Sequence, residues 1–147
     1  MQVSFTIPVP LKVLTIFIVI IAVLMTILLL MLLPICLLKI TLSSNEIVVR
    51  AIPMYSFSAR REDVEDVFIA DLSLRKELKP VLRIWGHGLP GYALGWFRLG
   101  NGAKAFCAIS SNTAVVFKLK DGSHLIVTPT NVTEFISALR ELGWNIS

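Results

Sequence analysis

Residues 13–38 read VLTIFIVIIAVLMTILLLMLLPICLL, a run of 26 residues without a charged side chain. A helix of about 20 apolar residues crosses a hydrocarbon core of about 30 Å, and a helix satisfies all its backbone hydrogen bonds within one segment. Two crossings would need about 40 residues and a polar turn, which this run lacks. The sequence therefore predicts one membrane-spanning helix over residues 11–40, after a tail of residues 1–10, with the lipid bilayer as its partner.

The alternative for this run is a cleaved signal peptide. Its apolar part covers about 7–15 residues and ends at a small-x-small site. Here the run is longer and continues into Leu37, Leu38 and Lys39, without small residues at that spacing, which favours a retained anchor. Pro34 is expected to kink or end the helix. Cys36 is interpreted as an unmodified residue at the membrane edge, with S-acylation as the alternative.

The rest of the 147-residue chain has room for one domain, expected over residues 41–147. The net charge of +4 overstates its basic character, because residues 41–147 hold twelve basic and ten acidic side chains. This balance argues against nucleic acid as a partner. Cys36 and Cys107 do not make a disulfide framework, and no Cys/His cluster indicates a metal site.

The Lys and Arg residues near the span indicate its orientation in the cell membrane. Lys12 and the α-amino group lie on one side, against Lys39 and Arg50 on the other, which favours a cytoplasmic domain. Two N-glycosylation triplets, at Asn131 and Asn145, would matter only if the domain faced outward.

After the anchor, short β-rich runs alternate with turns, as in an all-β domain. Turns or loops are expected at Ser43–Glu46, Arg60–Asp66 and Leu74–Pro80, the last as a polar, mobile loop. The expected strands are Ile47–Val49, Tyr55–Ala59, Val67–Leu72, Val81–Trp85, Tyr92–Leu99 and Ala103–Ile109. Asp121-Gly122 predicts a type I′ hairpin between Ala114–Lys120 and Ser123–Thr128. With Lys120 opposite Ser123, Leu119–His124, Phe117–Ile126 and Val115–Thr128 pair on the face expected to form the core.

The chain then shows the pattern of an amphipathic helix. Its apolar stripe consists of Val132, Phe135, Ile136, Leu139 and Leu142. Asn131 and Glu134 have the spacing of a capping box, and Gly143 stands where a C′ residue belongs. Such a stripe must be buried, and the preceding strands are the available partner.

Gly86-His87-Gly88-Leu89-Pro90-Gly91 has the spacing of the dinucleotide fingerprint. That motif requires a helix to begin at the loop, whereas the residues from Tyr92 onward indicate a strand, so the glycines are interpreted as a tight reversal between strands. A groove around this loop that takes an anionic group or a peptide is a further hypothesis, with candidate residues Arg83, His87, Gly88, Gly91, Tyr92 and Arg98. Ser123 beside His124 lacks the partners of a triad. No catalytic, metal or cofactor site is expected.

Several segments resemble the bacterial pleckstrin-homology-like (PH-like) family over about residues 40–142. The resemblance rests on Gly88–Tyr92, Gly95–Leu99, Asn101-Gly102, and the Asp121-Gly122 hairpin leading into Phe135. It implies a mainly β fold, a barrel of about seven strands closed by a C-terminal helix, and a membrane tether. It also implies a binding or assembly module without catalysis. Relatives that bind phosphoinositides use basic residues in the first hairpin loop, which here is Ser43–Glu46.

The sequence thus predicts a membrane-anchored PH-like adaptor that binds a protein partner or associates with itself. The alternative function is a sensor of a small ligand or lipid headgroup that uses the glycine-rich loop. An enzyme is not expected.

Overall fold

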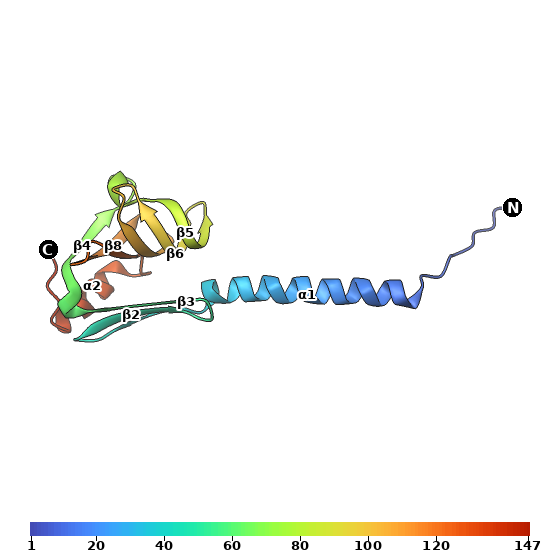
Figure 1. The fold of residues 1–147 in the computed structure, drawn as a ribbon, viewed down its shortest axis with the longest axis horizontal. Helices are drawn as coiled ribbons and strands as arrows, with labels where there is room; N and C mark the ends of the chain where they lie inside the picture. The colour runs from blue at the N-terminus through green and yellow to red at the C-terminus, as the bar shows by residue number, and fades with distance from the viewer.

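The computed structural model describes all residues, 1–147, and shows a long helix leading into a β-rich domain (Figure 1). Helix α1 (Leu11–Cys36) projects away from the domain and carries no charged residue after Lys12. Its side chains are exposed along nearly the whole length, and only Pro34 is buried. The apolar run therefore forms a helix, as predicted, and that helix is not part of the domain core.

The domain begins with a three-stranded antiparallel sheet in the order β1-β2-β3. The strands are β1 (Leu38–Leu42), β2 (Glu46–Ala51) and β3 (Tyr55–Arg60). The β1–β2 turn is closed by the Ser43 N–H, which donates to the Glu46 carbonyl at 2.9 Å. This confirms the turn predicted at Ser43–Glu46. Buried residues alternate along β2, because successive side chains of a strand point to opposite faces.

The second sheet has six strands in the order β4-β8-β9-β7-β6-β5. Their bounds are β4 (Val64–Asp71), β5 (Pro80–Leu89), β6 (Tyr92–Leu99), β7 (Lys104–Ile109), β8 (Thr113–Leu119) and β9 (His124–Val127). All neighbours are antiparallel except β7 and β9, which run parallel. Strands β4 and β5 are therefore the two edges of this sheet.

Two apolar cores hold the domain together. The first lies between the small sheet, one face of the large sheet and the C-terminal helix, with Ile47, Phe106 and Leu139 fully buried in it. The second gathers side chains from the opposite face of the large sheet, including Val116 and Ile126, around Leu72 and Leu78. Because neighbouring residues of β8 and β9 belong alternately to the two cores, the central strands of the large sheet are buried on both faces.

Helix α2 (Val132–Glu141) packs against the domain through the predicted stripe, with Ile136 and Leu139 buried. The Asn131 side chain accepts a hydrogen bond from the Glu134 N–H at 3.1 Å, which confirms the predicted cap. At the other end Gly143 has a φ of +85°, and the Trp144 N–H donates to the Leu139 carbonyl at 2.9 Å. This is the hydrogen bonding of a Schellman cap.

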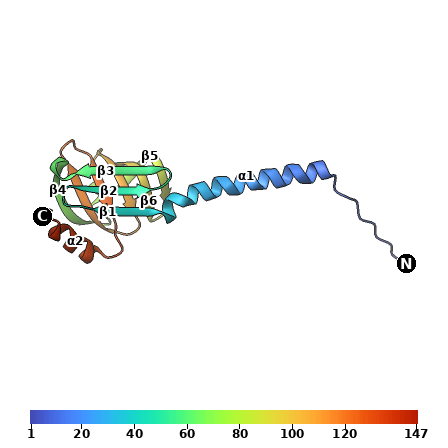
Figure 2. The same cartoon turned by 90° about the horizontal axis from the view of Figure 1, so that it is seen from below.

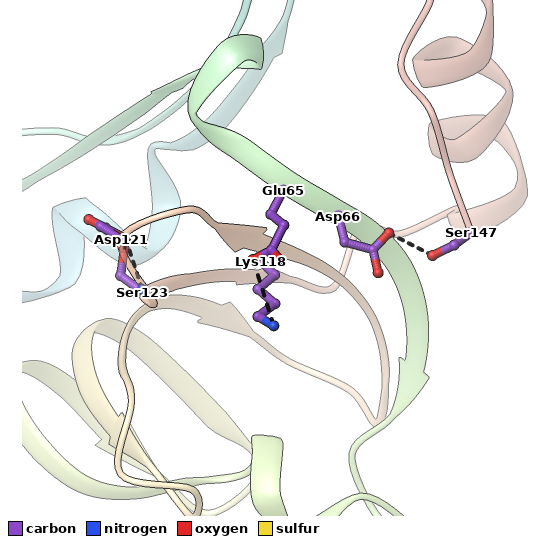
Figure 3. A network of polar contacts seen from close by, with 6 residues as sticks. All are labelled: Glu65, Asp66, Lys118, Asp121, Ser123 and Ser147. Carbon is purple, nitrogen blue, oxygen red and sulfur yellow. Dashed lines mark hydrogen bonds and ion pairs between the residues drawn. The ribbon is translucent and has the colours of Figure 1, made fainter.

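The residues after α2 fasten the helix to both sheets. The Trp144 indole N–H donates to the Ser43 carbonyl at 2.8 Å, and its ring meets Phe117 edge to face at 5.9 Å. The Ser147 hydroxyl donates to the Asp66 carboxylate at 2.7 Å, and its N–H donates to the Val67 carbonyl (Figure 3). Strand β4 is thereby covered by the C-terminal segment along part of its outer edge.

The fold class is confirmed as mainly β, between an N-terminal apolar helix and a C-terminal helix. The structure has nine strands rather than about seven, in two sheets that do not close into one barrel. Helix α1 ends at Cys36, not at residue 40, because Leu38–Leu42 pair with β2. This strand was missed because it continues the apolar run of the helix without a polar break.

The predicted register of the Asp121-Gly122 hairpin is wrong by one residue. In the structure Lys118 pairs with His124, Phe117 with Leu125 and Val115 with Val127. Only Gly122 has a positive φ, of +90°, whereas a type I′ turn needs two such residues. The loop is therefore a three-residue one, Lys120–Gly122, and Ile126 faces the second core instead of the first.

The segment Leu74–Pro80 is also more ordered than a polar loop. It contains a short 3-10 helix, Lys76–Leu78, and Leu78 is buried in the second core. The N–H groups of Gly100 and Asn101 donate to the carbonyls of Lys79 and Glu77. One apolar side chain among charged neighbours is enough to anchor the segment.

Candidate binding surface

The glycine-rich stretch lies at the end of β5 and in its turn to β6. Strand β6 begins at Tyr92, so no helix follows the glycines and the requirement of a dinucleotide site is not met. Gly86 and Gly95 pair across the two strands, each with a positive φ. A Cβ on Gly86 would overlap the Leu94 carbonyl, and one on Gly95 would overlap the Trp85 carbonyl. These two glycines therefore allow a close backbone approach.

A groove of about 820 Å³ opens beside this turn. Three segments line it: the β5–β6 turn, the connection between β4 and β5, and the loop Ser110–Asn112. Among the predicted site residues, Gly88, Gly91 and Tyr92 line this groove. Its volume is within the range of about 300–1,000 Å³ that is usual for small-molecule sites.

His87 lies on the other side of the β5–β6 hairpin, toward the small sheet. Its Nδ1 is 2.9 Å from the Tyr55 hydroxyl. The Nε2 of His87 and the hydroxyl of Tyr92 are buried without a hydrogen-bond partner. Burial raises the pKa of Tyr92, and the nearby Cys36 and Tyr55 raise it further. Burial also raises the pKa of Tyr55, against the opposing charge of Arg83. Both phenols therefore remain protonated at neutral pH.

The two candidate arginines are placed differently. Arg83 is exposed on β5, close enough to Tyr55 for its charge to act on that phenol. Arg98 is near the far end of β6 and donates to the Gly102 carbonyl at 3.0 Å. Six residues of strand separate it from Tyr92, or about 20 Å. The structure thus gathers His87, Gly88, Gly91 and Tyr92 at one end of the β5–β6 hairpin. Arg83 is opposite Phe97, next to the Leu82–Arg98 pair, and its side chain lies near Gly88. Arg98 stays apart.

Strand β5 carries a feature that the sequence reasoning missed. Four large apolar side chains, between 45% and 66% exposed, follow one another along this edge strand: Val81, Leu82, Ile84 and Trp85. We call them the β5 apolar row. The register of β5 against β6 shifts twice, between Pro80 and Leu82 and between Arg83 and Trp85, so the usual alternation of faces is interrupted.

The outer edge of β5 is also open. Its backbone hydrogen bonds run to β6 on one side, and no other backbone bond in the protein uses a group of residues 80–90. Unpaired edge groups next to exposed apolar side chains form a template for an added strand. The apolar run Val81–Trp85 could have been noticed in the sequence. Its position at an edge could not.

Other polar groups are scattered. No group of three or more His, Cys, Asp or Glu side chains is placed to hold a metal ion. Cys107 is buried in the second core, which raises the pKa of its thiol, and His124 is buried singly in β9. These residues are structural parts of the large sheet.

The chain matches the family described as bacterial PH domain over residues 38–143. The match begins at the first residue of β1 and ends just beyond α2, so it covers both sheets and the C-terminal helix. No curated protein and no solved structure gave a significant match. With two sheets, a C-terminal helix and a family match over most of its length, this chain belongs to the bacterial PH domain family.

Proposed function

We propose that this protein is a membrane-anchored adaptor whose PH domain binds an extended segment of a partner protein along strand β5. Membership of the bacterial PH domain family supports a binding role in general. The observation that carries the specific proposal is the open edge of β5 with its apolar row.

Helix α1 supplies the anchor. It is long and apolar enough to cross a membrane, and its apolar side chains are not buried against the domain. Its 26 residues span about 39 Å, more than the hydrocarbon core of about 30 Å. A soluble helix with so much exposed apolar surface would aggregate, whereas in lipid the same surface is satisfied.

The β5 edge is better suited to the addition of a partner strand than to the binding of a small ligand. In this mode, main-chain hydrogen bonds supply the affinity and contacts with alternate side chains supply the specificity. Tethering both molecules to one membrane raises their local concentration, so a weak contact suffices for assembly. Most edge strands in natural proteins are shortened, charged or covered. In strand β5, Arg83 is the only residue with a permanent charge.

A second candidate function is a sensor of a small ligand in the groove beside Tyr92. It is favoured by the groove volume of about 820 Å³ and by a lining that mixes apolar and polar residues. Gly88 and Gly91 line the groove without adding side chains to it. Binding of a ligand there would be lost in a Gly88→Trp variant and unaffected by changes in the β5 apolar row.

The experiment that tests the adaptor role is site-specific photo-cross-linking in membranes. A photoreactive amino acid at position 82 in the full chain is expected to cross-link to one extended segment of a partner. Ile84→Lys should abolish the cross-link. Ile69→Lys is a matched control, because Ile69 lies on β4, the opposite edge of the same sheet, with 48% exposure against 45% for Ile84.

The possible results distinguish a separate partner from self-association and test whether β5 is the binding site. A cross-link that maps only to a second copy of the chain would identify self-association through β5. A partner captured equally by the wild-type and Ile84→Lys chains would overturn the β5 site. The side of the membrane on which the domain lies limits which partners can reach it, and protease accessibility in sealed vesicles measures that side. The distribution of Lys and Arg residues favours the cytoplasmic side.

A further inference from the structure

Helix α1 is joined to the domain without a flexible linker. Strand β1 begins at Leu38, two residues after the helix ends at Cys36. Pro34 is buried, and Ile35 packs against the first core. The last turn of the helix is therefore part of the domain surface. A helix that starts to cross the hydrocarbon core near Val13 uses about 20 residues to do so and leaves it near Leu33. The domain must then begin at the membrane surface itself.

Two turns surround the point where the helix enters the domain. Leu38 pairs with Ala51, which places the β2–β3 turn beside the end of α1. The β5–β6 turn is at the same end, since His87 Nδ1 is 2.9 Å from the hydroxyl of Tyr55, and Tyr55 pairs with Ala51 beside the β2–β3 turn. In Figures 1 and 2 both hairpin ends lie on the side of the domain from which α1 departs.

This end of the domain presents apolar side chains to the outside. Four residues, between 42% and 61% exposed, come from three separate segments: Leu37, Ile52, Met54 and Leu89. We call them the rim. Pro53 and Pro90 stand next to rim residues in the two turns. The opposite end of the small sheet is formed by polar Ser43, Ser44, Asn45 and Glu46. The two ends of the domain thus differ in polarity.

Basic side chains lie immediately behind the rim. Lys39 and Arg50 are exposed and face each other across β1 and β2, one residue pair away from Leu38 and Ala51. No acidic residue occurs in the rim segments 37–39, 50–55 and 88–92. Apolar residues followed by cations match the order of layers in a bilayer, where acyl chains give way to lipid phosphates.

We propose that the rim inserts into the boundary between acyl chains and headgroups, so that the domain rests directly on the bilayer. Lys39 and Arg50 then meet the lipid phosphates. This differs from headgroup binding by the first hairpin loop, which here is Ser43–Glu46 at the far end. The inference rests on the proposed anchoring by α1. In Figure 2 strands β1–β3 run nearly along the direction of α1. The small sheet therefore meets the membrane end-on.

The test measures the depth of spin labels on the full chain in liposomes. Labels are attached to single cysteines in a Cys36→Ser background, with Cys107 protected by burial. The positions are Met54→Cys and Leu89→Cys in the rim, Ser44→Cys at the far end as the matched control, and Leu24→Cys in the middle of α1. At positions 54 and 89, accessibility to lipid-soluble oxygen should exceed accessibility to a water-soluble nickel chelate. At position 44 the order should be reversed.

The label at position 24 separates the two proposals. If it is in lipid while labels 54 and 89 are as accessible to the nickel chelate as label 44, seating on the membrane is overturned and anchoring stands. If the label at position 24 is in water, anchoring itself fails. Labels 54 and 89 shielded from both reagents would mean that protein, not lipid, covers the rim, which would also overturn the inference.

A second arm tests the cations. Raising the anionic lipid content from zero to about one third should move labels 54 and 89 deeper in the wild-type chain. Lys39→Gln with Arg50→Gln should remove this dependence and leave the label at position 24 unchanged. Lys118→Gln with Lys120→Gln at the far β8–β9 turn is the matched control and should keep the dependence. Equal behaviour of the two pairs would exclude a specific role for Lys39 and Arg50.

Discussion

The two edge strands of the large sheet, β4 and β5, differ in almost every respect that matters for association. Along β4 the exposed positions are Glu65, Ile69 and Asp71, so two of the three are acidic, and Ser147 bonds to the backbone of this strand. The Lys118 ammonium is 3.7 Å from the Glu65 carboxylate on this side (Figure 3). Along β5 the exposed side chains are apolar except for Arg83, and the backbone is uncovered. Natural sheets protect their edges with charges and coverings of the first kind. The unprotected edge is therefore the one to which a binding role is assigned.

The largest effect is expected where the C-terminal segment covers the protein on the β4 side. Trp144→Ala removes a side chain that is 4% exposed and contacts Phe117, and it should lower the free energy of unfolding by about 3–5 kcal/mol. Urea unfolding of the full chain in nanodiscs, followed by circular dichroism, measures it. Trp144→Phe keeps most of the volume and should cost less. Equal losses for both variants would contradict the packing argument.

The next effect concerns the close approach of β5 to β6. Gly86→Ala places a Cβ against the Leu94 carbonyl at a φ of +151°, and backbone strain alone should cost roughly 1–3 kcal/mol. The control is Gly91→Ala, also at positive φ but with open space around it, for which about 1 kcal/mol is expected. Hydrogen exchange of β5 amides should rise in Gly86→Ala and little in Gly91→Ala. The reverse order would mean that the β5–β6 pairing is not as close as described.

A pH dependence is expected from the β4 side of the sheet. Burial lowers the pKa of His124, and the neighbouring Lys118 lowers it further. The unfolded chain then takes up a proton more readily than the folded one. Stability is therefore full above about pH 6.5, the unperturbed pKa, and falls as the pH drops below it. Unfolding at pH 8 and pH 5 should show a smaller difference for His124→Asn than for the wild type. An unchanged difference would remove His124 as the cause.

The smallest effect on stability is expected on β5 itself. Trp85 is 58% exposed, so Trp85→Ala should change the free energy of unfolding by no more than about 0.5 kcal/mol. The same substitution should abolish cross-linking to a partner from position 82. Trp144 and Trp85 then form a pair in which one residue acts on folding and the other on binding. Comparable destabilisation by both would show that the β5 apolar row is a structural element.

Several residues of the candidate site could be predicted from the sequence, but which of them lie together could not. Gly88, Gly91 and Tyr92 were predicted to lie around one loop and do line one groove. Arg98 was grouped with them because it is near in sequence, yet it lies toward the other end of its strand. The apolar residues of the β5 apolar row could be seen in the sequence, but their position on an edge strand could not. Strand order depends on which segments pair over long distances, and no local pattern encodes it.

What the sequence determined by itself follows from local physics. The charge-free run makes α1 a helix, Asn131 and Gly143 end α2, and Ser43–Glu46 makes a turn, because each depends on residues within a few positions. The tertiary structure decided the rest. Leu38–Leu42 became strand β1 because β2 was there to pair with it. The β8–β9 register shifted by one residue so that Phe117 and Leu125 face one core while Val116 and Ile126 face the other. Both outcomes depend on burying apolar surface against distant segments, a free-energy gain that exists only once those segments have come together.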